Sequence, residues 1–347
     1  MSNVGQAGRA LLLVGAGALA GALLSAALCR RRRPPAPPPV PHDEREGPVQ
    51  LVMVTDAGQD LDDEMALILL SHLSREGLVD ARAVIANLTP AFARARLVRG
   101  TLDVLDLHAV PVGIGTDGGR EDAEDSFSAA APYMASTTGI RSFLLEPGRL
   151  LLLRTFREAS DGSLTLLCIS SLKDVALFLR DNEALFAQKV REVVIMGGAT
   201  IETVHTSAGA SERVVPDTAH NNEFCAQSSH FFYARCQALG VRLIVVSRWA
   251  GYACHVSREI YDQMADVGSI IGSRLRNAQR ASIQQLWVRA CSPADSAARQ
   301  GLPSRCDREW FLKTFCAGAR TSRSGDQPVW DLVLHFSMYD SVALIAA

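Results

Sequence analysis

A short acidic stretch constrains this chain more than any other feature. Residues 51–54 form an apolar run typical of a buried strand, and four carboxylates follow it within eight residues. These are Asp56, Asp60, Asp62 and Asp63. Anions this close repel one another, and a bound cation or raised pKa values would relieve the repulsion. Oxygen ligands of this kind favour a hard ion such as Ca²⁺ or Mg²⁺.

The residues after the acids predict a helix. It covers about residues 63–75, and Gly77 is placed to end it. The acids therefore lie between the carboxyl end of a strand and the start of a helix, where open α/β sheets bind their ligands. A solvated acidic turn, in which one Asp caps the helix, is the simpler alternative and stays open at this point.

Strands and helices alternate along the rest of the chain. Further strands are predicted at 81–86, 110–115, 164–169, 191–196 and 241–246, and helices at 91–107, 175–180 and 227–239. This alternation predicts an α/β fold with a mostly parallel central sheet and helices on both of its faces. Residues 121–149 are polar and receive no assignment.

The composition excludes some classes of protein. The chain has 347 residues, of which 48% are hydrophobic, and this is enough for one large domain or two smaller ones. A net charge of -2 gives no sign of a nucleic-acid partner. The eight cysteines show neither a CxxC pair nor zinc-ligand spacing, so we expect buried or free thiols. A disulfide between Cys306 and Cys316 is the less favoured alternative.

The N-terminal segment resembles a membrane anchor. Residues 10–29 are small and apolar, long enough to cross a bilayer, and arginines fill positions 30–33. The positive-inside rule then predicts a single-pass anchor over residues 1–33, with the rest of the chain, including the folded domain, on the cytoplasmic side. An organellar or secretory targeting segment is the alternative. Gly17 and Gly21 have GxxxG spacing, so a homo-oligomer also stays open.

Two boundaries follow the anchor. Residues 34–48 contain seven prolines and predict an extended linker, so the globular domain is expected over residues 49–347. Within it, residues 274–327 predict a helical insertion that could roof the site. Its aromatic residues are expected in the core rather than in stacking contact with a ligand; they are Trp310, Phe311 and Phe315.

Five parts of the chain resemble the inosine/uridine-type nucleoside hydrolases, over roughly residues 50–347. The resemblance rests on the acidic motif at 54–63, the strand and Asn at 83–87, the strand at 110–115, the strand pair at 166–176 and 193–199 with its Met-Gly-Gly-Ala, and the late segment 338–343. It implies a nucleoside hydrolase-like fold and Ca²⁺-dependent hydrolysis of the N-glycosidic bond of a ribonucleoside or related ribosyl compound.

The resemblance also implies a set of metal ligands. Asp56 matches the first acid of the family, which binds the ion and acts as general base. Asp63 and Asp340 match further ligands, and the ligating carbonyl falls at about Ile169. Asp62 is carried over both as a ligand and as the contact to a ribose 2′-hydroxyl.

Other residues are implied on the substrate side. Asn87 matches a contact to the ribose 3′-hydroxyl, and Asn221 or Asn222 stands for an Asn at the 5′ end. Tyr339 lies where purine-handling members often have His, next to the base. A Tyr is a poor proton donor at neutral pH because its pKa is about 10. His220 is among the candidates for the leaving-group acid, by residue type only, together with His205 and His255.

Departures from the family pattern keep alternatives open. Two extra residues separate Asp56 from Asp62, so Asp60 is an extra ligand, a replacement for Asp62 or a bystander. The incomplete 5′ set and Tyr339 favour a non-catalytic nucleoside- or ribosyl-binding module that keeps the metal site. A Mg²⁺-dependent phosphohydrolase ranks below both, because its Asp-x-Asp would have to follow the strand directly.

Overall fold

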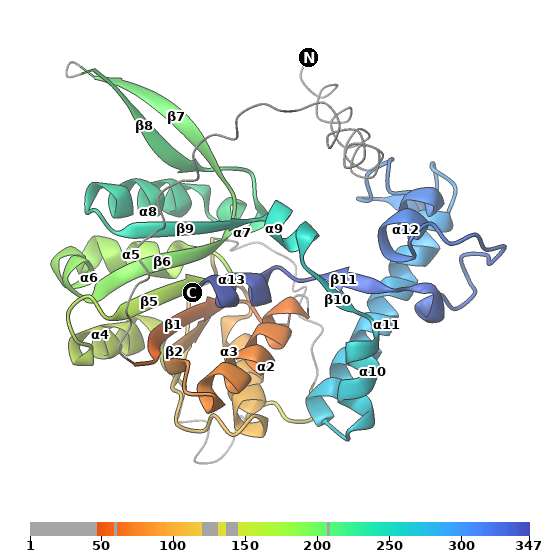
Figure 1. Ribbon diagram of the computed structural model, residues 1–347, viewed down its shortest axis with the longest axis horizontal. Helices are drawn as coiled ribbons and strands as arrows, with labels where there is room; N and C mark the ends of the chain where they lie inside the picture. The colour runs from red at the N-terminus through yellow and green to blue at the C-terminus, as the bar shows by residue number, and fades with distance from the viewer. Residues whose placement is uncertain (1–46, 59–60, 120–130, 137–144, 207–208) are drawn as a thin grey trace, which may run out of the picture. The chain divides into compact units, whose positions relative to one another are not determined.

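The centre of the fold is a seven-stranded sheet in which every strand pairs in parallel with its neighbours (Figure 1). Its order is β4-β3-β2-β1-β5-β6-β9. The strands are β1 (Val49–Thr55), β2 (Val79–Ala86), β3 (Val112–Ile114), β4 (Leu145–Pro147), β5 (Leu164–Cys168), β6 (Val190–Gly197) and β9 (Arg242–Ser247). This computed structural model describes residues 47–58, 61–119, 131–136, 145–206 and 209–347.

Helices cover both faces of the sheet. Side chains alternate along β1, so that Leu51 and Met53 enter one core while Val52 and Val54 enter the other. The first core is closed by α2 (Asp62–Arg75), α3 (Ala91–Val104) and α13 (Asp340–Ala346). The second is closed by α4 (Gly148–Glu158), α5 (Lys173–Asp181), α6 (Glu183–Lys189) and α8 (Ala226–Ala238). Burial on both faces explains why the inner strands, such as β1, have continuous apolar sequences.

The predicted parallel sheet with helices on both faces is confirmed. The strand after which the acids were expected is β1, and α2 follows it. Gly77 ends that helix with a positive φ of 70°. The backbone N–H of Leu78 then donates to the carbonyl of Leu73 at 2.9 Å, which satisfies one of the last helical carbonyls.

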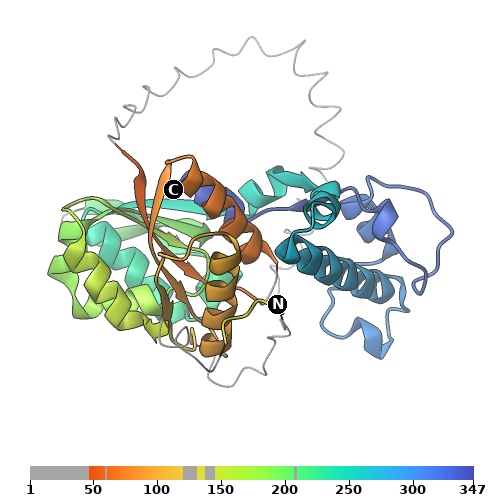
Figure 2. The same ribbon diagram turned by 90° about the horizontal axis from the view of Figure 1, so that it is seen from below.

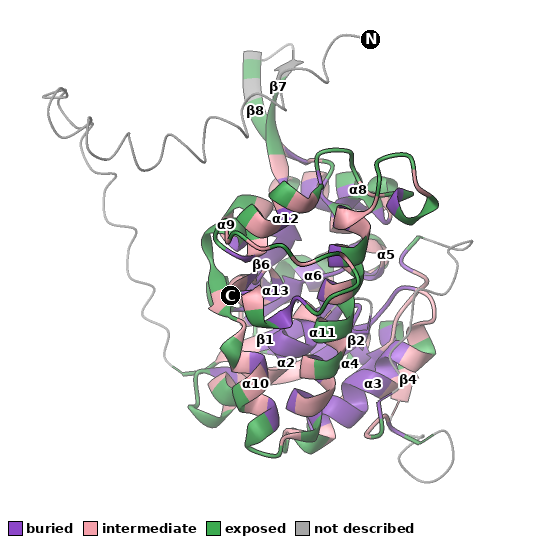
Figure 3. Ribbon diagram, turned by 90° about the vertical axis from the view of Figure 1, so that its right-hand side faces the viewer, coloured by how far each residue is buried: buried purple, intermediate pink, exposed green. Residues whose placement is uncertain are grey.

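Some elements were not predicted. Among them are β4, α4, α6 and the hairpin of β7 (Ala199–Thr206) and β8 (Gly209–Pro216). The hairpin pairs with itself rather than with the central sheet, and much of it is exposed (Figure 3). Its Ile201 side chain is among the exposed large hydrophobic residues. An apolar run marks a strand only where a core covers it, so the sequence lacked the usual signal here.

The insertion is helical, as predicted, but larger. A two-stranded ribbon of β10 (His255–Ser257) and β11 (His335–Ser337) brackets α10 (Glu259–Asp266), α11 (Ile270–Cys291) and α12 (Arg308–Phe315). Figures 1 and 2 show these helices to one side of the sheet. Phe311 is fully buried and packs on Trp287, with ring centroids 5.0 Å apart. Trp310 and Phe315 pack against the same cluster, so the expectation of a core role is confirmed.

The described cysteines are free thiols, including the buried Cys306 and Cys316, so the alternative of a disulfide between them is wrong. The predicted anchor over residues 1–33 and nearly all of the linker lie outside the described residues, and so does Asp60. In the part of the chain that the structure describes, no helix is both long enough and apolar enough to cross a membrane.

Candidate active site

A pocket of about 430 Å³ opens at the carboxyl ends of the central strands. The chain builds the sheet outward from β1 to β4 and then returns to place β5 on the other side of β1. The crevice between the ends of β1 and β5 is therefore the point where the strand order reverses. Ligands bind at this point in open α/β sheets.

The pocket gathers most of the residues singled out in the sequence. Those that line it are Asp56, Asp62, Asp63, Ile169, His220, Asn221, Tyr339 and Asp340. Asn87 and Asn222 do not line it. No residue of the helical insertion lines it either, so the expectation that the insertion roofs this pocket is wrong.

The loop between β1 and α2 is held by buried polar contacts. One carboxylate oxygen of Asp63 accepts hydrogen bonds from the Thr55 hydroxyl and from the backbone N–H of Asp56, the latter at 3.1 Å. Arg94 of α3, only 1% exposed, donates to the carbonyls of Asp56 at 2.5 Å and Ala57 at 3.2 Å. Arg94 was not predicted as a site residue, although its position on the apolar face of a predicted helix was a signal.

Asp62 connects the acidic loop to the end of the chain. Its Oδ2 accepts hydrogen bonds from the backbone N–H groups of Tyr339 at 2.7 Å and Asp340 at 2.9 Å. These groups belong to the N-terminus of α13, whose donors have no intrahelical partner. Asp62 therefore fixes the position of Asp340 in the pocket. The metal and sugar contacts expected of Asp62 stay predictions.

Asn221 connects the ends of two strands through hydrogen bonds. Its Nδ2 donates to the carbonyls of Ile169 after β5 and Met196 in β6, each at 3.0 Å. Both of its amide hydrogens are thus used inside the protein, and its Oδ1 is the atom left to meet a ligand hydroxyl. Asn222 is 2% exposed and donates to the Gly198 carbonyl at 2.8 Å, behind the pocket wall.

Asn87 lies in a buried network beside the pocket. Its Nδ2 donates to the Ser171 carbonyl at 3.0 Å and to Asp174 at 2.9 Å, and its Oδ1 accepts from the Ser170 hydroxyl at 2.6 Å. Burial raises the pKa of Asp174, although hydrogen bonds from Asn87 and Thr116 oppose the shift. This network supports the turn after β5; the predicted contact of Asn87 with a sugar stays a prediction.

One pocket wall is aromatic and comes from α9 (Arg248–Ala253), a helix that the sequence patterns did not predict. Tyr252 packs edge-on against Tyr339, with ring centroids 6.0 Å apart. Gly251 permits this, because a Cβ there would lie 2.2 Å from the Tyr339 ring. Burial, helped by the nearby Tyr252, raises the pKa of Tyr339 to about 12. Tyr339 therefore stays a neutral phenol and a poor proton donor at neutral pH.

The three histidines proposed by type separate in the structure. His220, in the short helix α7 (His220–Glu223), lines the pocket and packs against Phe224 with the rings tilted and their centroids 4.5 Å apart. His255 stacks on His335 in the β10–β11 ribbon and does not line the pocket. The side chain of His205 lies outside the described residues.

Known proteins resemble this chain in structure. No family model matches the sequence, and no curated protein matches it. A plant nucleoside hydrolase superposes with a TM-score of 0.54 over 86% of this chain and 78% of its own, at 15% identity. The chain has the nucleoside hydrolase fold. The resemblance drawn from the sequence motifs is thereby confirmed at the level of the fold.

Two effector proteins share this nucleoside hydrolase-like fold more closely. The effector XOO4466 is 25% identical over 87% of this chain and 81% of its own, with a TM-score of 0.72. The type III effector XopQ, in a complex with adenosine diphosphate ribose, is 24% identical over 87% of this chain and 82% of its own, with a TM-score of 0.68.

The oxygen donors of the pocket are of the type that the implied Ca²⁺ requires. Asp56, Asp63 and Asp340 are 6%, 2% and 6% exposed, and they share the pocket lining with Ile169. Buried carboxylates and a carbonyl are ligands of hard cations. Among the described residues, however, no three acidic, His or Cys side chains converge closely enough to hold one ion. As they stand, oxygens of Asp62 and Asp63 accept hydrogen bonds from the protein instead.

Proposed function

We propose that this protein hydrolyses the N-glycosidic bond of a ribonucleoside or related ribosyl compound, giving base and ribose. The observation that carries the proposal is the set of buried carboxylates at the end of β1, where the strand order reverses. The nucleoside hydrolase fold supports it. So does the adenosine diphosphate ribose in the XopQ complex, since that molecule is itself a ribosyl compound.

The carboxylates suit this chemistry. Cleavage of a glycosidic bond passes through an oxocarbenium-like transition state, which carries positive charge on the sugar. Asp56 and Asp63 present negative charge toward the pocket, and they are held in place by Thr55 and Arg94, so little reorganisation is needed. We assign the role of general base to Asp56, whose carboxylate accepts the proton of the attacking water.

We propose that Asp56, Asp62, Asp63 and Asp340, with the carbonyl of Ile169, would hold a Ca²⁺ ion. When bound, the ion would orient sugar hydroxyl groups and make a nearby water more acidic. Asp62 contributes in any case by positioning Asp340 through the N-terminus of α13.

A binding module without turnover is the second candidate. It is favoured by Tyr339, because a phenol with a pKa of about 12 does not protonate a leaving base at neutral pH. His220 is the pocket residue whose type suits that role, which keeps hydrolysis as the first candidate.

Reducing-sugar release from a panel of nucleosides, with Ca²⁺ present, separates the two candidates. We expect product from the wild-type protein and a loss of about 10²-fold or more for Asp56→Asn. Asp161→Asn is the matched control, because the Asp161 side chain is 66% exposed and remote from the pocket lining. Binding of nucleosides, measured by calorimetry, without formation of product would instead establish the binding module. If the protein neither binds nucleosides nor forms product, both candidates are excluded.

We further propose that residues 1–33 anchor the protein in a membrane, with the folded domain on the cytoplasmic side. Detergent-free fractionation tests this placement. Recovery of the intact chain in the soluble fraction would contradict it.

A further inference from the structure

We propose that the ribosyl compound bound in this pocket carries a phosphate, and that Arg248 recognises it. This inference rests on the proposed function, because it takes the acidic side of the pocket as the sugar site. It adds a charged group to the substrate and a binding residue to the protein, neither of which the sequence motifs indicated.

The strand order sets the distance between the two sides of the pocket. Asp56 follows β1, Ile169 follows β5, Gly197 ends β6 and Arg248 follows β9. Neighbouring strands are about 4.8 Å apart, so the chain positions after β1 and β9 are separated by three spacings, about 14 Å. A sugar held by the acids between β1 and β5 leaves the side beyond β6 for another part of the ligand.

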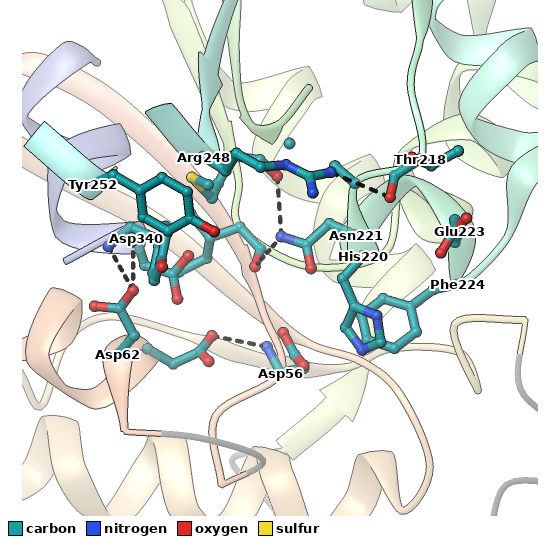
Figure 4. Close-up of a pocket in the computed structure, with 16 residues that line it drawn as sticks. Asp56, Asp62, Thr218, His220, Asn221, Glu223, Phe224, Arg248, Tyr252 and Asp340 are labelled. Carbon is teal, nitrogen blue, oxygen red and sulfur yellow. Dashed lines mark hydrogen bonds between the residues drawn. The ribbon is translucent and has the colours of Figure 1, made fainter. Parts of the chain in front are cut away.

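Opposite charges lie on these two sides. Figure 4 shows Asp62 and Asp340 on one side of the pocket, Arg248 and Thr218 on the other, and Asn221 between them. Among the described residues that line the pocket, Arg248 is the only lysine or arginine. Glu223 also lines the pocket and lies near Thr218 in Figure 4, but it is exposed, so water screens its charge.

The guanidinium of Arg248 has donors to spare. Its Nη2 donates to the Thr218 carbonyl at 3.3 Å, and in the described part of the chain it forms no ion pair. A guanidinium carries five N–H donors, so most of them stay available to a ligand. The single contact with Thr218 also orients the group without neutralising its charge.

A phosphate suits such a group better than a neutral nucleoside does. Guanidinium binds phosphate through paired, charge-assisted hydrogen bonds, which are among the strongest in proteins. The hydroxyl groups of a neutral nucleoside offer no negative charge to Arg248. A phosphate on the far side of the sugar would also lie away from the carboxylates of Asp56 and Asp340, which repel it.

Calorimetry on the full chain with ribose and ribose 5-phosphate, and with adenosine and adenosine 5′-monophosphate, tests the inference without turnover. We expect the wild-type protein to bind each phosphate ester about tenfold or more tightly than its neutral partner, at low ionic strength. Arg248→Gln should remove that difference, because the phosphate ester then loses the charge-assisted hydrogen bonds that the neutral compound does not make. Arg180→Gln is the matched control, since Arg180 is 60% exposed and pairs with Asp181 outside the pocket.

Each outcome is decisive. Equal affinity for the esters and the neutral compounds, or an unchanged preference in Arg248→Gln, overturns the phosphate inference while the proposed function stands. Binding of none of the four compounds, with or without Ca²⁺, defeats the proposed function itself. Should Arg248→Gln fail to fold, Arg248→Lys serves instead, because it keeps the charge but loses the paired donors and should retain only part of the preference.

Discussion

The carboxylate of Asp62 accepts a hydrogen bond from the backbone N–H of Asp340 at 2.9 Å, although 278 positions separate the two residues. The N-cap residue of α13, Tyr339, provides no side-chain cap of its own. Asp62 therefore acts as the cap from a different helix. This contact joins the acidic loop to the last helix and so determines where two pocket carboxylates lie relative to each other.

We expect Asp62→Ala to lower the free energy of unfolding by about 1–2 kcal/mol, the usual value of a lost N-cap. Asp62→Asn keeps an acceptor oxygen, so its loss in the free energy of unfolding should be smaller. Urea denaturation measures both. Equal losses in the two variants would show that the cap is not the source of the effect.

The ion pair between Glu64 and Arg274 links α2 to the helical insertion. The side chain of Glu64 is fully buried and that of Arg274 is 12% exposed. We expect Arg274→Ala to lower the free energy of unfolding by about 3–5 kcal/mol, because the Glu64 charge is left buried.

On the same helix, Arg276→Ala should lower the free energy of unfolding by only about 0–1 kcal/mol, since Arg276 pairs with the exposed Asp266. Denaturant titration compares the free energies of unfolding of Arg274→Ala and Arg276→Ala. A similar loss in both variants would mean that helix packing, rather than the buried charge, is responsible. The double variant Glu64→Gln with Arg274→Met should recover part of the loss, because no charge is then left buried.

Calcium should stabilise the folded protein if the pocket carboxylates bind it. At a Ca²⁺ concentration of about 100 times its Kd, binding should raise the free energy of unfolding by about 2.7 kcal/mol. Thermal unfolding with and without Ca²⁺ measures it, and Asp340→Asn should reduce the gain while Asp161→Asn keeps it. An unchanged melting temperature at millimolar Ca²⁺, together with no heat of binding, would count against the metal site.

Gly251→Ala should disturb Tyr339. A Cβ at this position would lie 2.2 Å from the ring, so the ring or α9 must shift. This shift should lower the free energy of unfolding by about 1–3 kcal/mol. We expect weaker nucleoside binding as well, because Tyr339 lines the pocket. The double variant Gly251→Ala with Tyr339→Ala removes the clash, and failure of that variant to recover stability would reject the steric explanation.

Alkaline pH should destabilise the fold through Tyr233. Burial raises its pKa above the usual value of about 10, so the folded state holds the proton that the unfolded state loses. Stability is therefore retained below pH 10 and falls as the pH rises from there, by up to about 1.4 kcal/mol per pH unit. Denaturation at pH 9 and 11 measures the fall. The free energy of unfolding of Tyr233→Phe should fall less steeply with pH than that of the wild-type protein. Identical slopes would show that another group titrates.

Much of the fold was predictable because burial leaves local patterns in the sequence. The inner strands of the central sheet are covered on both faces, so they appear as apolar runs, and Gly77 marks the end of α2 by its positive φ. The hairpin β7–β8 is exposed and pairs with itself, so it leaves no such pattern.

The sequence by itself determined the order of the elements and the placement of Asp56, Asp62 and Asp63 after the first strand. Only the tertiary structure decided which atoms meet. It brought Asp340 onto Asp62, placed Asn87 in a buried network, and turned Arg248 and Tyr252 toward the pocket. Local patterns report whether a residue is buried, whereas a side chain's partner depends on strand order and on contacts between distant segments.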